Sequence, residues 1–315
     1  TNLAACLALL IPIAITIALF VYLLTFIDPR IGIVGLIISV GLSPEITISG
    51  IQNIRLEDFI VPAIFAAWIT RLIERKEEFE PTSLKVPILL YLFIALVSSL
   101  VGIANETVKP QTTIFILGKT VEYFIIFLIL LNNVKSEVEA KAYVVLLILV
   151  SFATSIFSLL IYRQSPDAIR LMGPMGEGAN IIGGYLIMQI ALIVGLFLYA
   201  QNGFYRLALL IAALPPFIAL LHTYSRTSYA AFILALAIVG ILREKRLLIL
   251  TLAILLLFPI IAPSAIFERA RTITDIGTQD SPESWRARAY SWEYSLDTIA
   301  SSPFIGKGVG YTALG

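Results

Sequence analysis

The chain has 315 residues, of which 59% are hydrophobic and only 14% are charged, whereas ordinary soluble domains average about 25% charged residues. No single core can bury so many apolar side chains, because cores stop growing at roughly 250 to 300 residues, so a soluble globule is excluded. The balance of 22 Lys+Arg against 21 Asp+Glu argues against a nucleic-acid partner, and one histidine with one cysteine argues against a His/Cys zinc site.

Apolar stretches long enough to cross about 30 Å of hydrocarbon follow one another along the chain. Four of these stretches are short, and each of the four is either a full span, a re-entrant segment or a half-buried helix. They lie near 31–49, 58–73, 227–242 and 247–262. We expect an all-α, polytopic transmembrane helix bundle over residues 1–262. Because the first residue is Thr1 rather than Met, we also expect the chain to be part of a longer protein. About ten spans are expected, near 3–27, 31–49, 58–73, 87–103, 113–131, 142–162, 181–200, 207–224, 227–242 and 247–262.

Basic residues in the connections predict the orientation of these spans, because Lys and Arg are retained on the cytoplasmic side. The connections at 30, 71–85, 135–141, 206 and 243–246 carry eleven of them, against five in the loops opposite. We therefore expect the first group of connections to be cytoplasmic. The long polar segments, 163–180 and 263–315, are then extracytoplasmic, and the second forms a region of its own that is truncated before further spans.

Segment 263–315 contains the pattern of an amphipathic helix. Ser281 is expected as its N-cap, with Pro282 at the first helical position and Glu283 favoured by the helix dipole. We expect the apolar face to be buried, with the helix either packed on the bundle or lying in the membrane interface. The helix should stop at 301–303, and its apolar face carries Trp285, Ala289, Trp292, Leu296 and Ile299.

Lys119 and Glu122 stand three residues apart inside an apolar stretch, on one helix face. Gly118-Lys119-Thr120 imitates the end of a phosphate-binding loop, but Thr113 occupies the place of the required earlier glycine, so a nucleotide site is excluded. Ionised groups are costly inside a membrane and usually face the bundle interior. The two residues therefore form either a structural ion pair or part of a substrate path.

Arg226 follows Ser225 between two apolar runs, with no room for a solvated loop. A guanidinium held there needs an anion, and its planar fork suits phosphate oxygens. An anchor at the lipid headgroups is the alternative. His222 lies one turn earlier, and we expect it on the same helix face as Arg226. It is either a polar residue whose hydrogen bonds are satisfied within the fold or a catalytic base.

Arg170 precedes a Gly-rich stretch, from Gly173 to Asn180, that leads into a span. Its glycines would let backbone N–H groups approach an anion at a helix N-terminus, although a plain turn has the same composition. The later pattern Gly306-x-Gly308-x-Gly310 is expected to be a backbone kink that re-enters the membrane.

Over residues 163–310, three segments in this order resemble the O-antigen ligase and polymerase family of bacterial surface-polysaccharide enzymes. They read IRLMGPMGEGANIIGGYL, YSRTSYAAF and RAYSWEYSLDTIASSPFIGKGVG. In the family an Arg and a Gly-rich stretch precede a span, a Ser-Arg pair marks a junction, and an Arg stands four residues before a Trp, followed by Pro and G-x-G-x-G. The matching positions are Arg170, Gly173, Asn180, Gly184, Ser225, Arg226, Arg288, Trp292, Pro303, Gly306, Gly308 and Gly310.

Two departures from the family pattern limit what can be carried over. The family's loop carries Asn-Pro-Asn where this chain has Glu177-Gly178-Ala179-Asn180, so only Asn180 transfers. The family's catalytic His follows the G-x-G-x-G motif, beyond Gly315. The resemblance therefore does not give that role to His222, and it puts the general base outside these residues.

The resemblance implies an inverting, metal-independent glycosyltransferase in the bacterial inner membrane. It would move a glycan from a polyprenyl-diphosphate carrier to a hydroxyl of a lipid, glycan or protein acceptor on the extracytoplasmic face. The leaving group is a diphosphate, so arginines can supply the charge stabilisation that a metal supplies elsewhere, and no cofactor is expected. The expected catalytic residues are Arg170, Arg226 and Arg288, and the expected substrate-binding residues are Asn180, Ser225, Gly173, Trp292 and Arg286.

Helix geometry separates Arg288 from Arg286. At 100° per residue Arg288 lies about 60° from Trp285 and borders the apolar face, whereas Arg286 lies about 100° away. Arg286 shares its edge of the helix with Glu293 and Asp297, so we expect it to be a solvated residue with a small effect.

A multi-pass transporter or flippase for an anionic lipid or polysaccharide is the alternative function. Its site would lie near the bilayer midplane at interrupted helices, where Lys119 and Glu122 are the strong charges expected. The clustering of arginines at one membrane face favours the enzyme. A non-catalytic assembly protein is the third possibility, and both a ligase and a polymerase fit the motifs.

Overall fold

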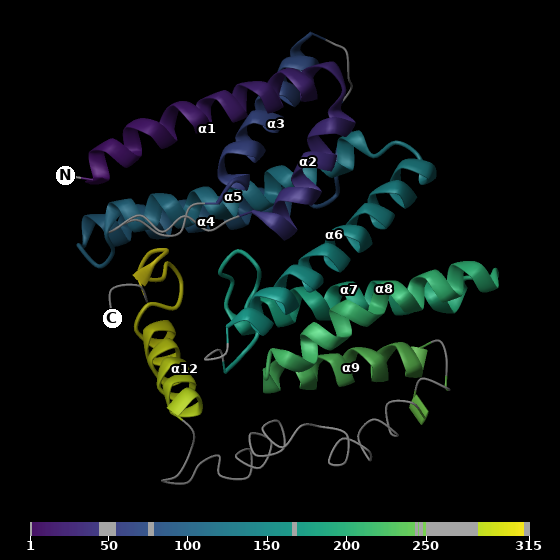
Figure 1. Ribbon diagram of the computed structural model, residues 1–315. Coiled ribbons are helices and arrows are strands. Elements are labelled where there is room, and N and C mark those ends of the chain that lie inside the picture. The colour runs from purple at the N-terminus through teal and green to yellow at the C-terminus, as the bar shows by residue number, and fades with distance from the viewer. Residues whose placement is uncertain are drawn as a thin grey trace. The chain divides into compact units, whose positions relative to one another are not determined.

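The computed structural model describes residues 2–43, 55–74, 79–165, 169–242, 245, 248–249 and 283–311. In these ranges the secondary structure is helical, with no strand, which confirms the all-α prediction (Figure 1). The ten helices are α1 (Asn2–Ile27), α2 (Pro29–Leu42), α3 (Glu57–Ile73), α4 (Lys85–Ala104), α5 (Pro110–Asn133), α6 (Glu137–Gln164), α7 (Ala179–Tyr199), α8 (Gly203–His222), α9 (Arg226–Leu242) and α12 (Glu283–Ser301).

Five of these helices, α4 to α8, are long and apolar enough to cross a membrane. The shorter apolar helices are α2, α9 and the part of α1 from Ile15 to Ile27. Nine of the ten expected stretches therefore coincide with helices, and the tenth, 247–262, lies outside the described helices. That all ten are full spans stays a prediction.

The chain divides into two compact units, which are described separately. The first comprises residues 1–143 and 287–315, and the second comprises residues 144–286. In the first unit α1, α2 and α3 pack on one another, and α5 contacts α2, α3 and α4. Its core includes Ile33, Leu36, Ile64, Ala67 and Trp68, each at most 3% exposed.

The break between α1 and α2 follows from local sequence. Asp28 is the N-cap of α2, and its side chain accepts a hydrogen bond from the N–H of Arg30 at 2.9 Å. Pro29 occupies the first helical position, where its missing N–H costs nothing. The chain therefore ends α1 and starts α2 at this point, and the two helices contact each other.

In the second unit α7 packs against both α8 and α9. Its core is formed by Leu171, Ile182, Leu186, Ile187, Ile190, Ala219 and Leu220. Leu171 precedes α7 by eight residues and is fully buried. The core therefore holds the polar loop before α7 against the helices, which matters for the site described below.

The apolar face of α12 carries exposed side chains, which does not favour the expected packing of this face on the bundle. Trp292 is 60% exposed, Leu296 66% and Ile299 60%. The end of the helix at Ser301 is as predicted, whereas the proposed cap at 281–282 lies outside the described residues. Leu296 and Ile299 are thus not buried against the described residues, and a position of the helix in the membrane interface stays a prediction.

Candidate functional site

The junction between α8 and α9 is a sharp turn of three residues. Helix α8 ends at His222 and α9 begins at Arg226, so these two side chains are on different helices and the predicted shared face is wrong. Tyr224 makes the reversal in a left-handed conformation, with φ of 48°. Such a conformation costs roughly 1 to 3 kcal/mol for a non-glycine residue and persists only where its surroundings enforce it.

Hydrogen bonds from the loop before α7 hold Arg170 against this turn. The N–H of Leu171 donates to the carbonyl of His222 at 2.8 Å, and the side chain of Leu171 is buried in the core. Arg170 then donates from Nε to the carbonyl of Thr223 at 2.9 Å. Its Nη2 donates to Oδ1 of Asn180 at 2.8 Å. Two bonds from one planar group fix the orientation of the guanidinium.

Asn180 joins the loop, α7 and the α8–α9 turn through one atom. Besides Arg170, its Oδ1 accepts a hydrogen bond from Oγ of Ser225 at 2.9 Å. Ser225 Oγ in turn accepts from the backbone N–H of Ser228 at 3.3 Å and from Ser228 Oγ at 2.9 Å, which is an N-cap arrangement for α9. Arg170, Asn180 and Ser225, three of the predicted site residues, are therefore in direct contact.

The N-terminal ends of α7 and α9 meet at this cluster. Asn180 is the second residue of α7, and Arg226, half-buried, is the first residue of α9. The two helices approach closely because Gly183 has no side chain: a Cβ there would lie 2.3 Å from Ser228 Oγ. Helix N-termini carry a positive partial charge. Two of them beside two arginines make a region suited to an anion.

The Gly-rich loop folds around its own carboxylate. The N–H of Gly173 donates to the carbonyl of Glu177 at 2.8 Å, and the N–H of Met175 donates to Glu177 Oε2 at 3.2 Å. Glu177 is 6% exposed, and a Cβ on Gly173 would lie 2.0 Å from Glu177 Oε2. The N–H groups of Gly173 and Met175 therefore bind Glu177 and not the external anion that the sequence suggested. Gly173 has no side chain, which leaves room for the Glu177 carboxylate.

His222 is satisfied within the fold. Its Nδ1 lies 2.8 Å from the carbonyl of Ile218, and its ring meets the edge of Tyr162 with centroids 5.5 Å apart. This agrees with the simpler of the two expectations for this residue.

In the first unit, the glycine loop (residues 306–310) lies against the hairpin of α4 and α5. Its backbone donates from Gly308 N to Ser98 Oγ at 3.1 Å and from Val309 N to Ser99 Oγ at 3.4 Å. Its carbonyls accept from the helix hairpin as well: Lys307 from Thr107 Oγ1 at 2.9 Å, and Val309 from Thr113 Oγ1 at 3.0 Å. The motif expected to be a re-entering kink is thus a docked loop.

Glycine is required in this loop for its backbone conformation. Gly306, Gly308 and Gly310 all have positive φ, at 75°, 101° and 90°, a region that other residues rarely adopt. The hairpin contributes a matching glycine, because a Cβ on Gly102 would lie 2.5 Å from the carbonyl oxygen of Lys307. Both sides of the contact therefore depend on missing side chains.

Residues 208–314 match the family model described as O-antigen ligase. This region is similar to O-antigen ligases, and we call it the O-antigen ligase domain. A search of curated proteins and a search of solved structures each gave no match for the chain. This similarity and the apolar helices together support a membrane protein of surface-polysaccharide synthesis.

The O-antigen ligase domain contains some of the predicted site residues but not all. Ser225, Arg226, α12 and the glycine loop lie within it, whereas Arg170 and Asn180 lie upstream. Arg286, Arg288 and Trp292 are exposed on α12. Arg288 and Trp292 belong to the first unit, whose position relative to the Arg170 cluster is not determined.

Tyrosines connect α12 to the glycine loop of the ligase domain. Tyr294 stacks on Tyr311, with ring centroids 6.0 Å apart and planes 6° apart, and Tyr290 stacks on Tyr294. Lys307 Nζ lies 5.2 Å from the Tyr311 ring centre. The hydrogen bond between the two hydroxyls raises the pKa of Tyr294 and lowers that of Tyr311.

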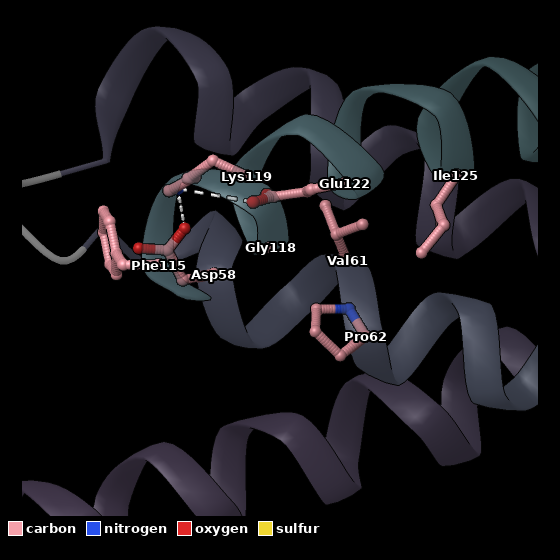
Figure 2. A pocket seen from close by; sticks show the side chains of 8 residues that line it. All are labelled: Asp58, Val61, Pro62, Phe115, Gly118, Lys119, Glu122 and Ile125. Atoms are coloured by element: carbon pink, nitrogen blue, oxygen red, sulfur yellow. Dashed lines mark ion pairs between the residues drawn. The ribbon is translucent and has the colours of Figure 1, made fainter. Parts of the chain in front are cut away.

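A charged pocket lies outside the ligase domain, between α3 and α5. Lys119 pairs with Glu122 at 3.3 Å, which confirms the expected i, i+3 pair, and also with Asp58 (Figure 2). The cavity has about 250 Å³, and its other walls are Val61, Pro62, Phe115, Gly118 and Ile125. Asp58 was missed because it lies far from Lys119 in sequence, and it stands in the first turn of α3.

Among the residues that the structure describes, no group of three or more His, Cys, Asp or Glu side chains could hold a metal ion. The polar partners that sequence reasoning missed are Ser98, Ser99, Thr107, Thr113, Thr223 and Ser228. Each is a small hydroxyl residue in or next to an apolar helix, where sequence alone does not single it out.

Proposed function

We propose that the protein transfers a glycan from a polyprenyl-diphosphate carrier to an acceptor hydroxyl, by inversion and without a metal. The observation that carries this proposal is the contact of Arg170, Asn180 and Ser225 where two helix N-termini meet. The O-antigen ligase domain supports a lipid-linked donor. A diphosphate is the leaving group of such a donor, and the cluster has the chemistry to stabilise it.

Arg170 and Arg226 are the proposed diphosphate ligands in the second unit. Arg170 is held in one orientation by Thr223 and Asn180, so it does not need to reorganise as charge develops on the leaving oxygen. Arg226 starts α9, where the helix N-terminus adds its own positive end. Asn180 orients Arg170, Ser225 holds Asn180, and Gly173 shapes the loop that carries Arg170.

Arg288 is the third proposed ligand, with Trp292 beside it as a substrate contact and Arg286 at the solvated edge. In the reaction the acceptor oxygen forms a bond to the anomeric carbon while the bond from that carbon to the diphosphate oxygen breaks. The electron pair of the broken bond stays on the diphosphate, where the arginines stabilise it. The hydroxyl proton passes to a general base, and a single displacement inverts the anomeric centre.

Variants of single arginines test this proposal in the full-length protein with a purified polyprenyl-diphosphate-linked donor. Arg170→Ala and Arg226→Ala should each slow covalent transfer by about 100 to 1000-fold, and lysine should recover little because it cannot reproduce the planar fork. Arg206→Ala is the matched control, because its Nε donates to the carbonyl of Ala200 at the other end of the span. Equal losses in all three variants would contradict the proposal.

The proposed topology has ten spans in residues 1–262, an extracytoplasmic region at 263–315, and the site on the outer face of the inner membrane. The excess of basic residues in the opposite connections supports it. A Ser165→Cys variant in a Cys6→Ser background should react with an impermeant maleimide in intact spheroplasts. Labelling only after the inner side is opened would reverse the orientation.

A transporter remains the alternative function. It would use the Asp58–Lys119–Glu122 pocket as part of its path, and it would move the glycan lipid without making a glycosidic bond. The transfer assay separates the two functions, because only an enzyme produces a covalently extended acceptor.

A further inference from the structure

Helix α12 presents an exposed apolar face that continues beyond the helix. Leu296 and Ile299 are 66% and 60% exposed, and Phe304, five residues on, is 93% exposed. Ile305, directly before the glycine loop, is 49% exposed. Exposed apolar patches of this kind mark an interaction surface with protein or membrane.

The face of α12 opposite Leu296 and Ile299 contacts the glycine loop. Tyr294 lies about 180° from Trp285 on the helix, at 100° per residue, and it stacks on Tyr311 at the end of the glycine loop. The loop in turn is hydrogen-bonded to α4 and α5. The apolar face is therefore turned away from the hairpin that anchors the helix.

The glycine loop is anchored on the last two turns of α4, which lead to the headgroup boundary if α4 crosses the bilayer. Ser98, which binds Gly308, is six residues before the end of α4, or about 9 Å along the helix axis. Helix α4 has 20 residues, about the length needed to cross the hydrocarbon, so its last two turns lie near the boundary with the headgroups. Phe304 and Ile305 directly precede the loop and are exposed.

The direction of α12 fits the plane of the membrane. Within the first unit α12 runs across the direction of α4 and α5 rather than along it (Figure 1). If α4 and α5 cross the bilayer, a helix that runs across them lies along its surface.

We propose that α12 is an interfacial helix, with the face of Trp292, Leu296 and Ile299 buried in the headgroup and acyl boundary of the bilayer. Interfacial helices bury their apolar face about 5 to 10 Å into this region, and Trp and Tyr are enriched there. The occupant of the exposed face is thus the lipid bilayer itself, and the glycine loop sets the depth of the helix.

One consequence rests on the proposed function. Arg288 borders the apolar face, four residues before Trp292, so an interfacial α12 holds its guanidinium at the level of lipid phosphates. A carrier lipid has its diphosphate at that same level. The helix would therefore present Arg288 to the donor without lifting the donor out of the membrane.

Accessibility of spin labels tests the placement of α12 independently of transfer activity. Single cysteines in a Cys6→Ser background replace Leu296 and Ile299 on the apolar face, and Asp297 on the polar edge as the matched control. The full-length protein is reconstituted in vesicles of phosphatidylethanolamine and phosphatidylglycerol, and collisions of the nitroxide with oxygen and with a water-soluble nickel chelate are measured.

The ratio of oxygen to nickel collisions should be several-fold higher at 296 and 299 than at 297. Nickel-dominated collisions at 296 and 299 would place the face in water, and low collisions with both reagents would place it against protein; either result overturns the proposal. Phe304→Cys lies outside the helix and should give the same high ratio of oxygen to nickel collisions. It keeps the test decisive if a helix variant fails to fold. A positive result with an inactive protein would disprove the proposed function while leaving the interfacial placement intact.

Discussion

Replacing Gly102 by alanine tests whether the glycine loop must dock on the α4–α5 hairpin. The new Cβ would lie 2.5 Å from the Lys307 carbonyl oxygen and 2.9 Å from the Cα of Gly308. Both are backbone atoms, so no side chain can turn aside. Since carbon and oxygen rest roughly 3.4 Å apart, the loop must move by about 0.9 Å.

This displacement would break the weakest contacts first. Val309 N to Ser99 Oγ is already 3.4 Å, and Gly308 N to Ser98 Oγ is 3.1 Å. Losing both costs about 1 to 3 kcal/mol, and removing a glycine from a helix interior returns roughly 0.5 to 1 kcal/mol. The free energy of unfolding should therefore fall by at most about 2.5 kcal/mol.

Activity should fall much more than stability, because the loop positions α12. A misplacement of about 1 Å can cost about 100-fold in rate, so glycan transfer by Gly102→Ala should drop by roughly that factor. Single-turnover transfer and thermal unfolding in the same detergent measure the two effects. Gly35→Ala in α2 is the matched control, since a Cβ there meets nothing within 4 Å. Normal activity of Gly102→Ala, or an equal loss in the control, would refute the positioning role.

Three further predictions concern the charged groups. Arg288→Ala should slow transfer by about 100 to 1000-fold and Arg286→Ala by less than about tenfold; comparable rates for the two variants would show that α12 attracts anions only by bulk charge. Transfer should persist in excess EDTA, and a loss restored by magnesium or manganese would rule out the arginine-only mechanism. Lys119→Met removes the positive charge between the carboxylates of Asp58 and Glu122, so it should destabilise the protein by about 3 to 5 kcal/mol. Thermal unfolding measures this change. If the pocket is instead part of a substrate path, the variant should lose transfer while its stability stays normal.

The helices were predictable from sequence because each membrane-spanning helix must satisfy its backbone internally and be apolar over a fixed length. The structure places α4 to α8 where hydropathy indicated them. Hydropathy separated the stretches 207–224 and 227–242, but it could not supply the turn between them, in which a left-handed Tyr224 puts His222 and Arg226 on different helices. A periodic pattern treats these residues as one turn of helix, and only backbone geometry shows that they are not.

The arginines of the site were predictable because charged residues stand out between apolar stretches of the sequence. Arg170 and Asn180 stand ten positions apart, and their contact follows from the anchoring of Leu171 in the core, which no local pattern reveals. The same holds for the glycine loop, whose partners Ser98 and Ser99 lie about 200 residues upstream. A serine inside an apolar helix has no distinguishing signal until a backbone N–H arrives from elsewhere in the chain. Sequence reasoning therefore finds the groups that could bind a diphosphate, while the hydroxyls and glycines that orient them emerge only from the packing of distant segments.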